Sequence, residues 1–165
     1  MSSENYTAIC LNAIDYKDND KLITLYAKGK GKIVATLRGC KSPKSKLKVA
    51  GSPLCLGEYE LNLTRGKYIV TGISDAELFH NLWSDLDKFY IALSMLEVFN
   101  KFTYDNEVYD DLFLELLKGL NALNNTDIEP TQIFVHYLYQ ITSLLGYAPC
   151  VDSCVMCGDD NIKGK

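Results

Sequence analysis

"EYELNLT" (residues 58–64) alternates at every position between polar and apolar side chains. Tyr59, Leu61 and Leu63 fall on one side of an extended backbone, and the polar residues fall on the other. This period of two is typical of a β-strand that buries one face. A second stretch, "GKIVATLR" (31–38), also carries an apolar residue at every other position.

Turn-forming sequences separate several such runs in the first half of the chain. We predict five strands there, near residues 6–13, 21–28, 32–38, 54–64 and 67–74. Short antiparallel strands must bury their apolar face and protect their edges, and closing into a small barrel achieves both. A small five-stranded barrel is therefore expected, with a β-sandwich as the alternative.

Between residues 77 and 83 the spacing of apolar residues changes from two to three or four, the period of a helix. We expect helices over residues 84–102, 109–120 and 128–146. Ser84 suits an N-cap, Pro130 a first helical turn and Gly146 a C-terminal cap. The fold class is therefore α+β, with a barrel domain at 1–78 and an all-α helical domain at 79–165.

The net charge of −4 conceals an asymmetry between these halves. Residues 1–77 hold 12 Lys/Arg against 8 Asp/Glu and carry +4, whereas residues 78–165 carry −8. The positive half is the candidate for binding a polyanion. No apolar run approaches the length of a transmembrane helix, and the N-terminus lacks the pattern of a secretory signal. We expect a cytoplasmic protein with no membrane partner.

The basic segment "LRGCKSPKSKLKV" (37–49) lies in a long link between two predicted strands. It contains no acidic residue and holds five cations: Arg38, Lys41, Lys44, Lys46 and Lys48. Extended backbone would spread them over roughly 20 Å, at about 3.3 Å per residue, which suits a run of phosphates. Long loops of this kind are often functional, although a solvated loop without a ligand explains the same residues.

Other cations extend this positive surface if their turns lie on the same side of the barrel. They are Lys28, Lys30, Lys32, Arg65 and Lys67. Aromatic side chains that stack on bases would point to single-stranded nucleic acid. Tyr26, Tyr59 and Tyr68 are candidates, but each is individually better explained by packing in the barrel or at its rim.

The last cysteines form the pattern Cys150-x3-Cys154-x2-Cys157. A Cys-x2-Cys pair followed by glycine is half of a zinc knuckle, and a structural zinc site needs four ligands. The sequence offers no later His or Cys, so either the second pair lies elsewhere or zinc is absent. The other three cysteines are scattered and suit reduced thiols.

Catalysis finds little support in the sequence. His80 and His136 are the two histidines, and neither belongs to a motif with a Ser or Cys nucleophile. The phosphate-cradling Gly-x4-Gly-Lys-Ser/Thr motif does not occur. We therefore expect a binding protein rather than an enzyme.

Four stretches, in this order, together resemble the bacterial RecO family of recombination mediators. They are "RGCKSPKSKL" (38–47), "LGEYEL" (56–61), "LLGYAP" (144–149) and "CVMCG" (154–158). The resemblance implies an OB-type barrel followed by a helical domain, with a zinc-finger element in many members. It maps the family's basic loop onto Arg38, Lys41, Lys44 and Lys46. It also maps the first zinc pair onto Cys154 and Cys157, whereas Cys150 is not a usual ligand position.

The resemblance also implies a function. Family members bind single- and double-stranded DNA, anneal complementary strands, work with RecR, and help load RecA onto strands covered by single-stranded DNA-binding protein. They usually continue several dozen residues beyond this sequence. Two alternatives use the same cations. One is a protein-interaction adaptor whose basic loop binds an acidic peptide or a second copy, and the other is an RNA-binding barrel.

Overall fold

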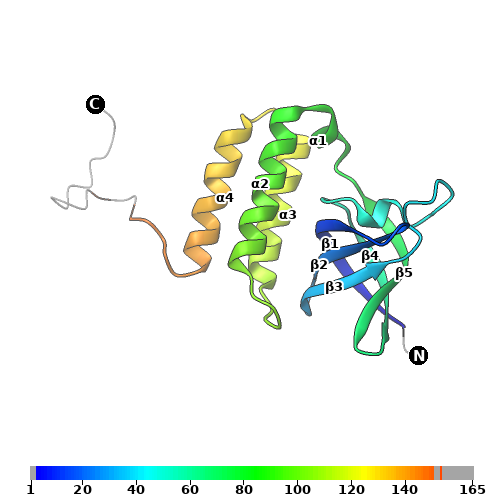
Figure 1. Ribbon diagram of the computed structural model, residues 1–165. Coiled ribbons are helices and arrows are strands. Elements are labelled where there is room, and N and C mark those ends of the chain that lie inside the picture. The colour runs from blue at the N-terminus through cyan, green and yellow to red at the C-terminus, as the bar shows by residue number, and fades with distance from the viewer. Residues whose placement is uncertain (1–2, 151–152, 154–165) are drawn as a thin grey trace.

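The computed structural model describes residues 3–150 and residue 153. Figure 1 shows a β-barrel formed by the first half of the chain, with the helices packed beside it. The strands are β1 (Ser3–Tyr16), β2 (Asp20–Ala27), β3 (Gly31–Leu37), β4 (Leu56–Thr64) and β5 (Lys67–Glu77). The helices are α1 (His80–Ser84), α2 (Leu86–Phe102), α3 (Asp110–Asn125) and α4 (Pro130–Leu144). None of these helices is both long and apolar enough to cross a membrane.

The five strands form a closed barrel in the order β1-β2-β3-β5-β4, with β4 pairing back onto β1. This is the strand order of the OB fold, so the predicted barrel is confirmed and the sandwich alternative is wrong. One detail differs from the expected antiparallel arrangement: β3 and β5 run parallel from Ala35↔Tyr68 to Leu37↔Val70. The chain crosses between β3 and β4 through residues 38–55, and this crossover brings β5 alongside β3 in the same direction.

The barrel interior follows the alternation seen in the sequence. Ile33, Ala35 and Leu37 of β3 are buried, as are Tyr59 and Leu61 of β4. The Tyr59 hydroxyl donates to the backbone oxygens of Ala50 and Cys55, at 3.1 and 3.3 Å. A buried phenol thus holds the end of the crossover against the barrel.

The helices begin and end largely where local chemistry predicts. Pro130 occupies the first turn of α4, and Gly146 follows α4 with a φ of +83°, as expected of a terminating glycine. The N-cap of α2 is Asp85 rather than Ser84, because residues 80–84 form the short helix α1. The Asp85 carboxylate accepts the backbone N–H groups of Asp87 and Lys88.

Tyr26 joins the barrel to the helices. Its ring is fully buried, 4.8 Å from the ring of Phe99 on α2 and 5.1 Å from that of Phe113 on α3. The Tyr26 hydroxyl accepts the backbone N–H of Tyr109 at 2.5 Å, and burial raises the pKa of this phenol. One apolar cluster therefore contains side chains from both halves of the chain. The division into domains at 1–78 and 79–165 stays a prediction.

The turn between β2 and β3 rests on the segment that links α2 to α3. The Gly29 N–H donates to Oδ1 of Asp110 at 2.9 Å. Gly31 has a φ of +85°, and a Cβ atom at this position would overlap the backbone oxygen of Glu107. Only glycine combines that backbone conformation with so close an approach.

Replacing Gly31 with Ala should therefore cost more stability than the same change at Gly29. Gly29 has a φ of +72°, but a Cβ there would meet no other atom within 4 Å. Both substitutions incur left-handed strain of about 1–2 kcal/mol, and Gly31→Ala adds steric overlap of about 1–3 kcal/mol. Urea unfolding of the two variants measures the difference. Equal losses would show that the turn does not depend on its contact with Glu107.

Candidate nucleic-acid interface

A hollow of about 590 Å³ lies on the outer face of the barrel. It extends from the β1–β2 turn across β2 and β3 to the β4–β5 turn, and we call it the barrel-face hollow. Its lining combines cations, tyrosines, an acid and small or apolar residues: Tyr16, Lys17, Asp20, Leu22, Val34, Thr36, Arg38, Gly66, Lys67 and Tyr68. In OB-fold proteins the face between these two turns is the usual ligand-binding surface.

The period of two in β3 explains which side chains reach this hollow. Since Ile33, Ala35 and Leu37 point into the barrel, the residues between them point outward. Val34, in the middle of the strand, is 54% exposed on this outer face. The strand thus contributes Val34 and Thr36 to the hollow, and Arg38 stands directly after its last residue.

The two flanking turns supply the remaining cations. Lys17 directly follows β1 in a left-handed conformation, and its ammonium lies 5.2 Å from the centroid of the Tyr16 ring. Lys67 begins β5 and lines the hollow, whereas the neighbouring Arg65 is exposed beside it and is not part of the lining. Tyr68 lines the hollow and also packs partly against the barrel core.

The basic loop is anchored to the β1–β2 turn. The Gly39 N–H donates to Oδ1 of Asp20 at 2.9 Å, and the Lys41 N–H donates to the Asn19 oxygen at 3.3 Å. The Lys41 ammonium also lies 3.0 Å from Oδ2 of Asp15. Lys41 is therefore ion-paired in the unbound protein. The basic loop itself contains no acidic residue, but Asp15 of β1 lies beside it.

The loop is compact, so the expected extended backbone is wrong. Successive turns are closed by Ser42 N–H to Gly39 oxygen at 3.3 Å and Ser45 N–H to Ser42 oxygen at 3.0 Å. Glycine and proline, with two serines, favour such turns over a strand. Leu47 packs partly against the barrel core. A packed stem therefore presents Lys44, Lys46 and Lys48 to solvent, beside the ion-paired Lys41, which is also exposed.

Lys32 lies away from this surface. Its ammonium donates to the backbone oxygens of Asn100 and Thr103, at 2.5 and 2.6 Å, at the C-terminal end of α2. A cation there satisfies carbonyl groups that have no partner within the helix. Burial lowers the pKa of Lys32. We therefore leave Lys32 out of the proposed DNA surface.

Lys28 and Lys30 are also separated from the basic loop. They flank Gly29 in the β2–β3 turn, at the opposite end of β3 from Arg38, where the turn contacts Asp110. The β2–β3 turn therefore does not lie on the same side of the barrel as the basic loop, and its lysines do not extend the same positive surface. The sequence suggested five cations outside the basic loop. Among these five, Lys67 lines the barrel-face hollow, together with Arg38.

The three tyrosines proposed to stack on bases also differ in where they lie. Tyr26 and Tyr59 are fully buried and cannot stack on a base, whereas Tyr68 lines the hollow. Sequence reasoning missed Tyr16 and Lys17, because neither lies in the basic segment at residues 37–49. The available signal was an aromatic and a basic residue together at the end of a barrel strand, a place where OB folds bind ligands.

The predicted zinc ligands Cys154 and Cys157 lie outside the described residues, and Cys150 is exposed. Within the described part of the chain, no group of three or more His, Cys, Asp or Glu residues is placed to hold a metal. Zinc binding therefore stays a prediction. Cys10, Cys40 and Cys55 are buried reduced thiols of the barrel. Burial raises the pKa of the Cys10 thiol to about 12, which makes it a poor nucleophile.

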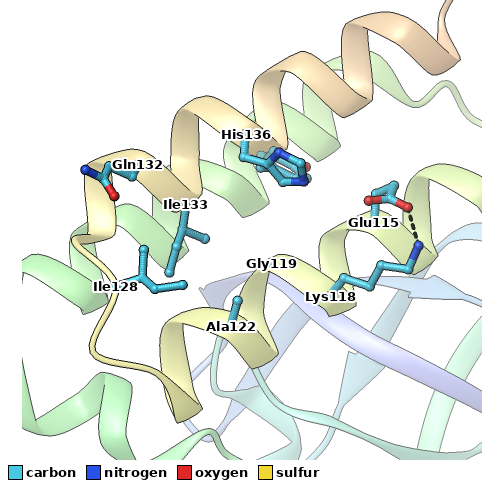
Figure 2. Close-up of a pocket in the computed structure, with 9 residues that line it drawn as sticks. Glu115, Lys118, Gly119, Ala122, Ile128, Gln132, Ile133 and His136 are labelled. Atoms are coloured by element: carbon cyan, nitrogen blue, oxygen red, sulfur yellow. Dashed lines mark hydrogen bonds and ion pairs between the residues drawn. The ribbon is translucent and has the colours of Figure 1, made fainter.

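A smaller hollow of about 300 Å³ lies between α3 and α4, as Figure 2 shows. Ile128 and Ile133 contribute apolar walls, and His136 reaches its edge from α4. Glu115 and Lys118 form an ion pair of 2.5 Å at its rim. Because these two charges neutralise each other, the lining selects neither an acidic nor a basic ligand.

A closed barrel with this strand order, and with a basic, aromatic face between two turns, defines an OB-fold protein. Family models support this class. "Recombination protein O N terminal" matches residues 1–82, and "Recombination protein O C terminal" matches residues 83–164. The chain belongs to the RecO family of DNA repair proteins.

Individual relatives agree with the family models. The chain is 32% identical over 152 residues to DNA repair protein RecO of Acetivibrio thermocellus, covering 92% of this chain and 61% of the relative. It is 28% identical over 157 residues to the protein of the same name from Syntrophomonas wolfei, covering 94% and 62%. The chain thus spans about three fifths of the length of the curated relatives it matches.

Lys32→Met should lower the free energy of unfolding and leave DNA binding by the folded protein unchanged. Losing a charged donor to two partly buried carbonyl groups costs about 1–3 kcal/mol. Lys30→Met, on the exposed neighbouring turn, is the matched control and should change stability by no more than about 0.5 kcal/mol. Thermal unfolding and fluorescence anisotropy measure the two properties. Normal stability with a selective loss of DNA affinity in Lys32→Met would return this residue to the DNA surface.

Proposed function

We propose that this chain is the DNA-binding part of a recombination mediator that holds single- and double-stranded DNA on its barrel. The observation that supports this most is the basic loop, in which a packed stem presents Lys44, Lys46 and Lys48 to solvent. Arg38 connects the loop to the barrel-face hollow. The family supplies the biological context, since the named relatives are DNA repair proteins.

The mechanism that we propose is electrostatic and includes no covalent step. Lysines that neutralise phosphates release condensed counterions from the DNA, and this release drives binding without selecting a sequence. Two complementary strands repel each other less when a positive surface neutralises part of their charge. The same surface would therefore assist annealing, and the protein would act as a binding protein rather than an enzyme.

The helical half would have a different role. Residues 78–165 carry a net charge of −8 and would repel DNA. We propose that this half contacts protein partners. The family resemblance implies that these partners are RecR and single-stranded DNA-binding protein, and that their contacts help to load RecA. A zinc ion held in part by Cys154 and Cys157 would belong to this half. The bacterial cytoplasm, where the chromosome lies, would be the site of action.

A second candidate function has one observation in its favour. The ion pair of 3.0 Å between Lys41 and Asp15 shows that the basic loop accepts a carboxylate. An adaptor that binds acidic peptides would use the same chemistry. Length dependence separates the two functions, because affinity for DNA rises with the length of the strand, whereas a peptide site saturates with one short ligand. Competition between RNA and DNA tests the RNA-binding alternative.

Lys44→Ala/Lys46→Ala should weaken DNA binding and reduce its salt dependence. Each lysine that contacts a phosphate of single-stranded DNA contributes roughly 0.7 to the slope of log affinity against log salt. Two such contacts predict a slope that falls by about 1.4. Fluorescence anisotropy with a labelled oligonucleotide over a salt series measures this slope.

Lys28→Ala/Lys30→Ala is the matched control. It removes the same charge from the same barrel, but at the turn that contacts the helices. Its salt slope should equal that of the native protein. If both variants lose the same slope, DNA responds only to total charge and the basic loop is not the site. If the native protein binds no DNA at low salt, the acidic-peptide function takes its place.

A further inference from the structure

A hollow of about 340 Å³ lies at the end of the helical half where α3 begins and α4 ends. We call it the helix-end hollow. Its lining has the apolar walls Val108, Leu112, Leu144 and Leu145, and it includes the acids Asp110 and Asp111. Val108 is 52% exposed and Leu144 is 48% exposed. Tyr104 in the α2–α3 link and Tyr147 after α4 are exposed as well. Exposed apolar side chains around a hollow are typical of a surface that another molecule covers.

The charges at this hollow favour a cation. Asp110 and Asp111 lie in the first turn of α3, and none of the described residues that line the hollow is basic. The positive end of the α3 dipole would by itself explain these two acids. The C-terminal end of α4, however, adds partial negative charge, and its last turn, which the structure describes in full, contains no basic residue. Lys28 and Lys30 lie on the neighbouring β2–β3 turn, outside the lining.

A lysine side chain fits this lining. Its aliphatic stem can pack on apolar walls while its ammonium group reaches carboxylates and the carbonyl end of a helix. Oδ1 of Asp110 accepts the Gly29 N–H at 2.9 Å, which holds this carboxylate in place, and Asp111 is exposed next to it. A small inorganic cation would make no use of the apolar walls. The hollow therefore suits a protein segment that presents lysines.

This chain itself has a segment of that kind. The basic loop presents Lys44, Lys46 and Lys48 on a packed stem. In Figure 1 this loop projects from the side of the barrel that faces away from the helices, whereas the hollow lies beside the β2–β3 turn, at the other end of β3. A loop therefore cannot reach the hollow of its own molecule, but it can reach that of a second copy. The charges of +4 on residues 1–77 and −8 on residues 78–165 favour the same contact.

We propose that the helix-end hollow docks the basic loop of a second copy of this chain. Lysines of that loop insert between the apolar walls and pair with Asp110 and Asp111. Because the two contact surfaces differ, the contact does not close into a symmetric dimer, and molecules associate head to tail. This association needs no DNA and goes beyond the proposed function. It uses the lysines that are proposed to bind phosphates, so DNA would release the associated molecules.

Sedimentation velocity of the full chain, over a range of protein and salt concentrations, measures the association. It should increase with protein concentration and weaken with salt, which screens the charges at the contact. Asp111→Lys places a like charge against the loop and should weaken association about 10-fold or more. Asp127→Lys is the matched control, because Asp127 is an exposed acid in the α3–α4 link, at the other end of the helices. This control should leave the association constant within about twofold.

Mixing two variants separates a lost contact from a lost fold. Asp111→Lys keeps a native basic loop, and Lys44→Ala/Lys46→Ala keeps a native hollow. Each variant alone should stay monomeric at a concentration where the native chain associates, whereas their mixture should form a one-to-one complex that grows no further. Such a complex also shows that both variants are folded. A mixture that stays monomeric, while thermal unfolding shows both variants to be folded, would overturn the docking surface.

DNA distinguishes failure of this docking surface from failure of the proposed function. A single-stranded oligonucleotide that saturates the basic loop should abolish association. Association that persists on DNA-saturated protein, or that Asp111→Lys and Asp127→Lys weaken equally, would overturn the docking surface and leave DNA binding intact. A native chain that stays monomeric at every concentration and at low salt would overturn it as well. If the chain associates but binds no DNA, the proposed function is wrong, and the salt series and the mixing experiment support the docking surface.

Discussion

The structure depends on how the β2–β3 hairpin is seated against the helices. Tyr26 takes part in this contact in two ways, because its ring packs against Phe99 and Phe113 while its hydroxyl accepts the Tyr109 N–H. A buried phenol without that partner would lose the hydrogen bond that it makes with water in the unfolded chain. Packing and hydrogen bonding therefore select the same arrangement, and together they fix one end of the barrel against the helical half.

Because the β2–β3 hairpin packs against the helices, the cations of the barrel have two different roles. Lys32 neutralises the carbonyl end of α2 and becomes part of the internal structure. Arg38, at the other end of the same strand, stays on the open face and lines the hollow. One short strand thus has a structural cation near its start and a candidate binding cation directly after its end, six positions apart. The acidic helical half covers one end of the barrel and leaves the basic loop accessible.

The barrel offers two kinds of chemistry side by side. The basic loop presents exposed ammonium groups on a packed stem, a form suited to phosphates of any sequence. The barrel-face hollow differs from the loop, since its lining combines cations with tyrosines and apolar residues. Arg38 belongs to both surfaces.

The sequence by itself determined the strands, the main helices and the position of the basic loop, because alternation, helical spacing and local charge are properties of neighbouring residues. It did not determine the parallel β3–β5 pair, the turns within the loop, or the ion pair between Lys41 and Asp15. Periodicity predicts that Lys32 and Arg38 both point outward from β3, but not what lies outside. Only the tertiary structure placed a helix end against Lys32 and open solvent beside Arg38, because those surroundings come from residues far away in the chain.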